Sequence, residues 1–389
     1  MKFERSPSTN DASKLLLQIA ARPARNAARK IDKPLALYGA GKLGKMAIEF
    51  LQQIGISPSL VVDANPSASI DDPFWLDKEI FSAAAVPMLI RSSYMLVVSI
   101  ASLSFEELAD TLSSQGWIDI VSFYDVTEAY TDLYPLSNGW VLHNLKEADI
   151  KSTQEVLSEW GDDLSRAHHI QFLAWHRFRE DWTFQDAPVE LDNRYFIPEV
   201  MRRLGCQESF LDVGAHQGEI SEQFRFKMEN NFKNIWMIEP DPTNFAYIKN
   251  FRYGKGNERV NLFAFGVADS VGHRLFYSGI GYASQLSLLG KEKIEVTTID
   301  QLHLDPTFIK IHLEGWELEA LKGATKTIRQ YKPILAVTIY HNQLGMWQIP
   351  MWLIMQTRAM AVRYKFYLRL HSWCGTGAVL YAIPDELIF

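Results

Sequence analysis

The sequence predicts an α/β protein with two Rossmann-like, doubly wound domains, the second built on a seven-stranded sheet that ends in an antiparallel hairpin. Two glycine-rich turns, at residues 39–44 and 214–218, each follow a short apolar run and precede a helical pattern. Apolar runs alternate with helical patterns around both turns, which is typical of parallel sheets. Near the end of the chain, two runs with a period of two flank a turn at residues 374–377, which indicates a hairpin.

Composition and spacing divide the chain into four predicted parts. They are an N-terminal helical segment (1–33), a Rossmann-like domain of the nucleotide-binding type (34–125), a helical connector (126–205) and a second α/β domain (206–389). A chain of 389 residues has room for two or three domains. With 47% hydrophobic and 22% charged residues, the composition is that of an ordinary globular protein.

Charge and cysteine content exclude several classes of function. The net charge of -7 argues against broad binding to nucleic acid or to an anionic membrane, which needs a positive field. Two cysteines, Cys206 and Cys374, are too few for a disulfide framework or a structural zinc site. The polar N-terminus lacks the apolar core of a signal peptide, and no apolar run approaches the ~18 residues of a spanning helix. We expect a cytoplasmic protein without a membrane span, with an oligomer possible.

The first glycine-rich turn has the pattern and the context of a dinucleotide-binding fingerprint. The strand at 35–38 runs into G-x-G-x-x-G, then a helix, and then a second strand that ends in an acid at roughly the expected distance of 20 residues. A possible second nucleotide site, for NAD or a nucleotide-sugar, is therefore formed by Gly39, Gly41, Gly44 and Asp63. The same glycines also serve the packing of a helix on a strand, so both interpretations stay open.

Helical patterns dominate both the start of the chain and the connector. Residues 11–30 are predicted as a helix that ends in a basic run, and residues 152–178 as helix-like connector. The connector is rich in histidine and tryptophan, yet no spacing there matches a metal-ligand pattern. We predict no metal site, and we interpret these side chains as a core that packs against the next domain.

The second turn, in the sequence FLDVGAHQG of residues 210–218, differs from the first. It has fewer glycines than a dinucleotide fingerprint and lacks the Lys-Ser/Thr pair that binds phosphate. A nucleoside ligand without a pyrophosphate suits it, and S-adenosylmethionine is the commonest of these. The next strand ends in an acid that could accept hydrogen bonds from a ribose. The predicted cofactor-binding residues are Asp212, Gly214, Ala215, His216, Gly218, Glu239, Pro240, Ala268 and Asp269.

Five strands and a hairpin are predicted in the second domain. The strands lie at residues 209–213, 235–239, 260–265, 308–312 and 334–340, and a helix opens at Trp316. Together with the hairpin they give the seven-strand plan of S-adenosylmethionine-dependent methyltransferases. Residues 270–295 form a long insertion over the same crevice, which we interpret as an acceptor-binding lid loop.

Three sequence blocks carry a resemblance to a known family. They are residues 210–218, the pair Glu239-Pro240, and the segment FIKIHLEGWE of residues 308–317, supported by residues 297–300, 321–324 and 340–350. From about residue 192 to 384 the chain resembles the FkbM-type methyltransferases. The resemblance implies O-methylation of a sugar or a related secondary metabolite with S-adenosylmethionine. The domain at 34–125 is similar to Rossmann modules found beside such enzymes in surface-polysaccharide genes, which implies polysaccharide biosynthesis.

Candidate catalytic residues lie where two predicted strands of this domain end. Methyl transfer to a hydroxyl requires alignment of the acceptor and often the removal of its proton. His312, where the family usually has aspartate, could act as the base, or could merely bond a loop. Glu314 could assist or only shape the turn, and His341 could act or be structural.

These observations predict an S-adenosylmethionine-dependent O-methyltransferase that acts on a hydroxyl of a sugar or polysaccharide precursor. The expected partner is a small-molecule or saccharide acceptor, without nucleic acid. Two alternatives are a nicotinamide-dependent oxidoreductase that uses the N-terminal domain and a non-catalytic cofactor-binding protein. The first lacks an evident Tyr-x-x-x-Lys pair for hydride transfer, and the second is motivated by His312.

Overall fold

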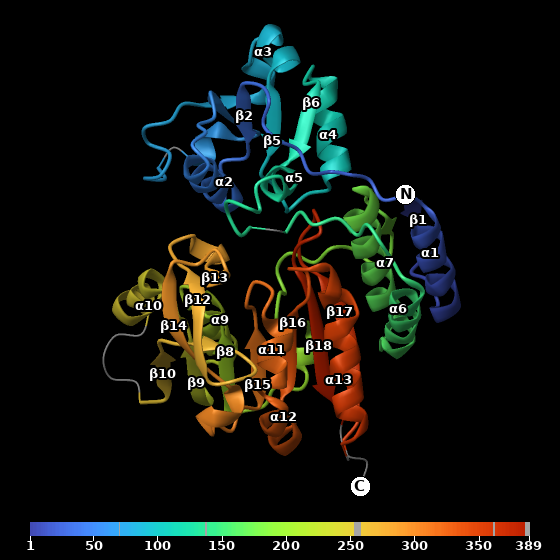
Figure 1. Cartoon of the computed structure of the whole chain (residues 1–389), viewed down its shortest axis with the longest axis vertical. Helices are drawn as coiled ribbons and strands as arrows, with labels where there is room; N and C mark the ends of the chain where they lie inside the picture. Colours follow the sequence, from blue (N-terminus) through green and yellow to red (C-terminus); the bar gives the residue numbers. More distant parts are fainter. Residues whose placement is uncertain (70, 137, 253–257, 361, 386–389) are drawn as a thin grey trace.

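The computed structural model describes residues 1–69, 71–136, 138–252, 258–360 and 362–385 (Figure 1). One α/β unit, from the N-terminal third of the chain, lies above a larger α/β unit from the C-terminal half. Helices between them in sequence pack along the side of the larger unit, close to the N-terminus.

The N-terminal sheet has five parallel strands in the order β4-β3-β2-β5-β6. This order, with the first strand at the centre, is that of a Rossmann-type half. In chain order its elements are β2 (Leu35–Tyr38), α2 (Lys42–Gln53), β3 (Leu60–Asp63), β4 (Ile80–Ser82), α3 (Met88–Ser93), β5 (Met95–Val98), α4 (Phe105–Ser114), β6 (Asp119–Ser122) and α5 (Phe123–Glu128).

The C-terminal sheet has seven strands in the order β10-β9-β8-β15-β16-β18-β17. All neighbours are parallel except β18, which runs antiparallel to both β16 and β17, so the terminal hairpin is confirmed. The strands are β8 (Glu208–Val213), β9 (Phe232–Ile238), β10 (Val260–Phe263), β15 (Phe308–Ile311), β16 (Ile334–Thr338), β17 (Tyr364–Leu370) and β18 (Ala378–Pro384). The predicted fold class is therefore confirmed.

Alternate residues of the C-terminal strands point to two separate cores, as the pleat of a sheet requires. Leu211 and Val213 face one core, whereas Phe210 faces the other. The first face is covered by α6 (Glu147–Glu159), α7 (Asp163–Phe178), α11 (Glu317–Lys322), α12 (Thr325–Tyr331) and α13 (Gln348–Arg358). The second is covered by α8 (Pro198–Met201) and α9 (Glu219–Lys227), and α10 (Pro242–Tyr247) follows β9. The sheet is thus doubly wound.

The predicted helix over residues 11–30 is too long. Helix α1 spans Thr9–Ala21 and packs on α6 and α7, and the basic residues after it lie outside any helix. Arg22 instead pairs with Glu180 and lies over the ring of Phe178. Basic side chains after an amphipathic helix do not by themselves extend it, because ion pairs elsewhere can hold them.

The helical stretch predicted at 152–178 is broken into α6 and α7. A Cβ at Gly161 would lie 3.0 Å from a ring carbon of Tyr367 on β17, so a larger residue at this break would crowd that ring. Asp162 then caps α7 by accepting from the amide of Ser165 at 2.8 Å.

The prediction that residues 270–295 form a long loop is wrong. The segment forms strands of a four-stranded sheet, order β11-β14-β12-β13, with β11 (Gly266–Val267), β12 (Gly272–Tyr277), β13 (Gln285–Leu286) and β14 (Glu292–Thr297). Asp241, the N-cap of α10, ties it down by accepting from the amide of Gly279 and the hydroxyl of Ser284, each at 2.8 Å. The period-two pattern at residues 293–297, Lys-Ile-Glu-Val-Thr, was the missed signal.

The two α/β units share a hydrophobic core. Ile280 and Ala283 from the small sheet, and Cys374 from the hairpin turn, pack in one cluster with Phe50 and Leu51 of α2. The amide of Trp373 donates to the carbonyl of Ala101 at 2.7 Å. The remaining elements are β1 (Lys2–Phe3), paired with β7 (Thr183–Phe184), and the short turns of helix at Pro66–Ser69, Ala83–Ala85, Ile248–Arg252, Gly281–Ala283, Ile299–Leu302 and Gln343–Met346.

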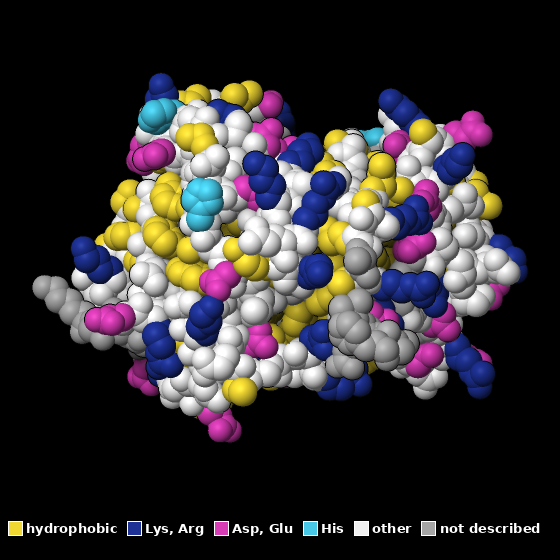
Figure 2. Space-filling view, turned by 90° about the horizontal axis from the view of Figure 1, so that it is seen from below, with side chains coloured by type: hydrophobic (Ala, Val, Ile, Leu, Met, Phe, Trp, Pro, Cys, Tyr) yellow, Lys and Arg dark blue, Asp and Glu magenta, His cyan; other side chains and the backbone are white. Residues whose placement is uncertain are grey.

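Lysine and arginine side chains on the face seen from below are interspersed with acidic ones (Figure 2). Binding to a polyanion would favour a continuous basic field there, which this face does not present. In the part of the chain that the structure describes, every helix falls short of the length and apolarity that a membrane crossing needs.

Candidate active site

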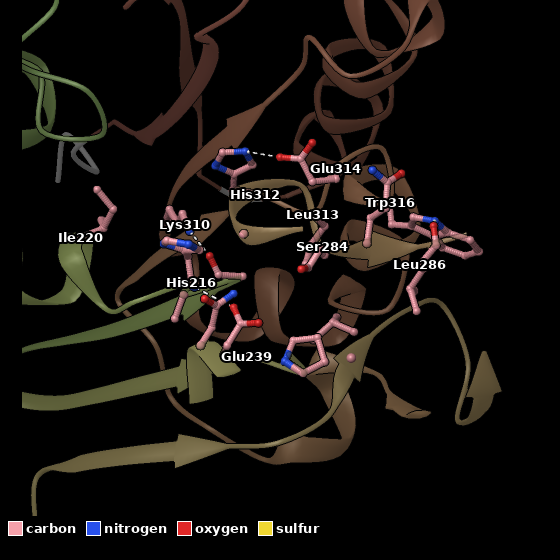
Figure 3. Close-up of a pocket in the computed structure, with 18 of the residues that line it drawn as sticks. His216, Ile220, Glu239, Ser284, Leu286, Lys310, His312, Leu313, Glu314 and Trp316 are labelled. Atoms are coloured by element: carbon pink, nitrogen blue, oxygen red, sulfur yellow. Dashed lines mark hydrogen bonds and ion pairs between the residues drawn. The ribbon is translucent and has the colours of Figure 1, made fainter. Parts of the chain in front are cut away.

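A cleft opens at the carboxyl ends of β8, β9 and β15, where open parallel sheets bind their ligands. Its empty volume is about 950 Å³, part of which is open to solvent. Figure 3 shows His312 and Glu314 at one end, His216 and Glu239 at the other, and Ser284, Leu286 and Trp316 along a wall. Seven predicted site residues line it, namely Gly214, Ala215, His216, Glu239, Pro240, His312 and Glu314.

The turn after β8 needs glycine because the end of a neighbouring strand lies against it. Gly214 has φ +76°, and a Cβ there would lie 2.0 Å from the carbonyl oxygen of His312. The neighbouring strand end therefore forbids a side chain at this position. Gly218, also left-handed at φ +74°, is the N-cap of α9. Both glycines shape the turn so that backbone groups of Ala215 and His216 reach the cleft.

Asp212 lies beneath the turn, fully buried, and is not part of the described lining of the cleft. One of its oxygens lies 2.9 Å from Nζ of Lys310, and the other accepts from the hydroxyl of Ser221 at 2.7 Å. Lys310 also donates to the carbonyl of Gly214 at 2.6 Å. Asp212 thus anchors the glycine turn through Lys310, and its predicted contact with the cofactor stays a prediction.

Glu239 follows β9 and is 5% exposed. Its two carboxylate oxygens accept from the amides of His216 (2.7 Å) and Asp241 (2.9 Å). Burial raises the pKa of Glu239 to about 7, although these amides act in the opposite direction. Each oxygen keeps a lone pair, so the side chain can still accept from the hydroxyls of a ribose.

The other predicted cofactor residues lie less close to the cleft. His216 lines it with φ +51°, and burial lowers the pKa of its imidazole to about 4. Ala268 is buried after β11, and Asp269 is exposed beside Ser270, both outside the described lining. Their predicted contact with the cofactor stays a prediction.

The structure brings the three predicted catalytic residues together. Nε2 of His312 lies 3.0 Å from Oε1 of Glu314, and Nε2 of His341 lies 3.3 Å from the same oxygen. The rings of the two histidines stack with centroids 5.1 Å apart. The side chains of His312, Glu314 and His341 are 20%, 11% and 3% exposed, so this histidine–glutamate cluster is largely shielded from water.

Glu317, in the first turn of α11, holds this cluster in place. Its Oε1 lies 2.6 Å from Nδ1 of His341 and accepts from the hydroxyl of Thr338 at 2.8 Å. Its two oxygens also accept from the amides of Leu313 and Gly315, each at 3.0 Å. These bonds stabilise a turn in which Glu314 has φ +49°, a conformation that costs free energy in a residue with a side chain.

Opposing effects set the protonation of the cluster. Burial lowers the pKa of His312 to about 3, despite the carboxylate of Glu314. For His341, burial also disfavours the charge, but Glu314 and Glu317 outweigh it and raise its pKa well above the ordinary value. Burial would raise the pKa of Glu314, yet His341 and His312 lower it.

Sequence reasoning missed four residues around this site. Tyr195 and Tyr340 place their hydroxyls 3.0 Å from Nδ1 and 3.2 Å from Nε2 of His312. Arg194 lines the cleft and donates to the hydroxyl of Tyr340 at 3.2 Å. The fourth residue, Lys310, is the one that the sequence could have indicated, because a lysine inside an apolar strand requires an acidic partner.

The acid and two glycines of the N-terminal fingerprint contact other backbone groups of the same turn. Asp63 accepts from the amides of Ala40 (2.7 Å) and Asn65 (2.8 Å). A Cβ at Gly44 would lie 2.0 Å from the carbonyl of Gly39, whereas one at Gly41 would meet nothing within 4 Å. Two of the three glycines thus have packing or backbone reasons, since Gly39 itself has φ +112°. A nucleotide at this turn stays a prediction.

The histidines of the connector have structural surroundings. Nε2 of His168 bonds the carbonyl of Pro188, and the indole of Trp160 donates to His169 at 3.1 Å. His176 stacks on Trp140 with ring centroids 3.5 Å apart. These contacts agree with the interpretation of the connector as core.

The strand order, the glycine turn after β8 and the acid after β9 define the Rossmann-type methyltransferase fold. Residues 212–362 match the family model of the methyltransferase FkbM domain. The C-terminal half thus carries an FkbM domain, and the protein is an S-adenosylmethionine-dependent methyltransferase.

A similar solved structure agrees on the fold. The structure of the methyltransferase FkbM from Methylobacillus flagellatus KT is 20% identical with a TM-score of 0.59, and the match covers 96% of this chain and 99% of that chain. An rRNA methylase from Streptococcus thermophilus is 11% identical with a TM-score of 0.33, over 51% of this chain and 99% of that chain. No curated protein matches the chain. The comparisons give no support to NAD or a nucleotide-sugar as a cofactor.

Proposed function

We propose that the protein transfers a methyl group from S-adenosylmethionine to a hydroxyl of a sugar or polysaccharide precursor. The observation that carries this proposal is the lining of the cleft. It includes Glu239, an acid suited to accept hydrogen bonds from a ribose, and the histidine–glutamate cluster. The family model supports the methyl transfer. The choice of a saccharide hydroxyl rests on the resemblance in the sequence and on the polar groups at the cluster end.

The residues of the glycine-turn end fit S-adenosylmethionine. Glu239 offers lone pairs to a ribose diol, and Val267, Phe276 and Leu286 offer apolar surface to an adenine ring. The turn residues Gly214 to His216 leave room for a ligand beside the backbone. When bound, S-adenosylmethionine supplies an electrophilic methyl group on a positively charged sulfur.

The acceptor end is the histidine–glutamate cluster. His312 and Glu314 present polar atoms to the cleft, and Trp316 lies across from them with its indole donating to the carbonyl of Leu286 at 3.0 Å. This bond holds the ring of Trp316 beside the cleft, where it can pack against the apolar face of a sugar. His312 and Glu314 then orient the reacting hydroxyl, and its proton leaves at this end of the cleft.

The test combines binding and turnover with the full chain. Calorimetric titration should show one site for S-adenosylmethionine, and a panel of nucleotide-sugars and oligosaccharides should include an acceptor that takes up a labelled methyl group. His312→Ala should reduce turnover about 100- to 10,000-fold and leave cofactor affinity within a few-fold. His273→Ala, at an exposed histidine on β12, is the matched control and should behave as the parent.

Each contrary outcome points to one alternative. Tight binding of NAD without S-adenosylmethionine would favour the oxidoreductase. Cofactor binding without turnover on any acceptor of the panel would favour a binding protein. Normal turnover of His312→Ala would place proton removal elsewhere, with His341 as the next residue to test.

A further inference from the structure

We propose that the histidine–glutamate cluster is a binding site for a divalent transition-metal ion, with His312, Glu314 and His341 as ligands and an open position toward the acceptor. The sequence predicted no metal site, because the connector shows no ligand spacing and these three residues do not form a local motif. They come from the ends of two neighbouring parallel strands, β15 and β16.

The donor atoms have the separation that coordination requires. One atom from each of the three residues lies within 4.8 Å of the others. The two Nε2···Oε1 distances, 3.0 and 3.3 Å, are close to the ligand–ligand spacing of about 3.4 Å that follows from zinc–nitrogen bonds of about 2.1 Å in a tetrahedron. Only small side-chain shifts would thus centre an ion among them.

The carboxylate of Glu314 joins the two histidines at their Nε2 atoms. Nε2 of His341, in a residue only 5% exposed, meets Oε1 of Glu314 at 3.3 Å as an ion pair rather than in a hydrogen bond of good geometry. A metal ion between these atoms would take the place of the shared proton, because metal ligands bind in their deprotonated form.

The other ring nitrogens are occupied as in metal-ligating histidines. Nδ1 of His341 lies 2.6 Å from Glu317, and Nδ1 of His312 lies 3.0 Å from the hydroxyl of Tyr195. A carboxylate or hydroxyl on Nδ1 fixes the ring, and an ion at Nε2 of His312 would displace the hydroxyl of Tyr340, which lies 3.2 Å from that atom. The carboxylates of Glu314 and Glu317 also supply two negative charges, against one guanidinium from Arg194.

Two imidazoles and one carboxylate select the kind of ion. Imidazole favours zinc, iron and cobalt over magnesium and calcium, which prefer oxygen ligands alone. His312 and Glu314 line the cleft, so the open position would face it. The identity of the molecule that fills the open position rests on the proposed function. It is the acceptor hydroxyl, whose proton the ion would help release to water. Binding of the ion itself can be measured without any acceptor.

The experiment uses the full chain, freed of metal with a chelator and titrated with Co²⁺. Visible absorption should develop bands of four- or five-coordinate cobalt that saturate at one equivalent, and Zn²⁺ should displace them. Glu314→Gln should lose the bands. Glu317→Gln, which weakens the bond to Nδ1 of His341 but leaves all three ligands in place, should weaken binding about 10- to 100-fold without abolishing it. The exposed-histidine control, His273→Ala, should keep parent affinity.

A second variant guards against loss of folding in Glu314→Gln. His312→Asp replaces a nitrogen donor by oxygen, so it should still bind one ion but shift its preference from Zn²⁺ toward Mn²⁺. No saturable uptake by the parent protein, or uptake that Glu314→Gln and His312→Asp leave unchanged, would overturn the proposal. If the chelated protein binds S-adenosylmethionine and retains full turnover without metal, the metal proposal fails while the proposed function stands. If the protein takes up metal but does not bind S-adenosylmethionine, the proposed function fails while the metal proposal stands.

Discussion

At the scale of single residues, Glu239 makes the cofactor end of the cleft sensitive to pH. Burial raises the pKa of this carboxyl to about 7, and a ribose diol would bind its ionised form better than its neutral form. Affinity for S-adenosylmethionine should therefore fall about tenfold for each pH unit below about 7 and level off above it. Calorimetry between pH 5.5 and 8.5 measures this dependence.

Replacing this carboxylate by an amide separates its charge from its shape. Glu239→Gln should lower affinity at pH 8 by roughly 1.5–3 kcal/mol, or about 10-fold or more. The variant should also lose the pH dependence, because an amide does not titrate. An unchanged pH profile in Glu239→Gln, with circular dichroism like that of the parent, would mean that another group controls cofactor binding.

The buried pair of Lys310 and Asp212 should matter mostly for stability. Their side chains are 3% and 0% exposed and lie opposite each other on β15 and β8. Lys310→Met would leave the carboxylate buried without its charge partner, so the free energy of unfolding should fall by about 3–5 kcal/mol. Urea denaturation measures the loss, and the double variant Lys310→Met/Asp212→Leu should recover much of it. A loss as large in the double variant would show that packing, not charge, is the cause.

At the scale of elements, α7 should make the fold sensitive to acid. Burial lowers the pKa of His168 to about 4 and those of His169 and His176 to about 3. Their folded pKa values lie below the unfolded value of about 6.5, so the unfolded state binds more protons once the pH falls below that value. Their contribution to stability is complete above pH 6.5 and is lost as the pH falls toward 4.

The size of this effect can be isolated by removing one group. Each histidine can contribute up to about 1.4 kcal/mol per pH unit to the slope of unfolding free energy against pH. His169→Gln, whose amide oxygen can still accept from Trp160, should lower that slope by up to about 1.4 kcal/mol per pH unit between pH 6 and 4.5. Urea denaturation at each pH measures the slope. His143→Gln, at an exposed position, should leave it unchanged. Equal slopes in all three proteins would contradict the assignment.

The sequence predicted most elements because local patterns and the fold agree. The strands that end at Val213 and Ile238, and the hairpin of β17 and β18, follow from apolar runs, glycine and alternation. The small sheet of β11 to β14 was missed because its glycines suggested a loop. What the sequence could not supply were contacts between distant segments. Glu317 looked like a residue of a helix first turn, but its bond to His341 depends on the pairing of β15 with β16.

At the scale of the whole molecule, the two α/β units are joined by contacts that the predicted boundaries did not suggest. Lys42 in the first unit pairs with Glu219 of α9 at 3.2 Å, and Glu219 lines the cleft. The hairpin turn at Trp373 and Cys374 packs against the first unit through Ala101 and Ile100. The first unit therefore stands over the carboxyl edge of the second sheet (Figure 1). The division at residues 33, 125 and 205 stays a prediction.

The cysteines offer a direct measure of whether these units move apart. Cys206 is exposed, whereas Cys374 is 3% exposed in the core that the units share, where burial raises the pKa of its thiol. A disulfide reagent such as DTNB should label one thiol of the native protein at once. The thiolate is the reactive form, so Cys374 should react only when that core opens. In Cys206→Ser, the rate of labelling should be very slow in water and should rise with urea in step with global unfolding. Rapid labelling of Cys374 that is independent of urea would show instead that the units separate readily in the native protein, and that the N-terminal unit acts as a hinged cover rather than a fixed wall of the cleft.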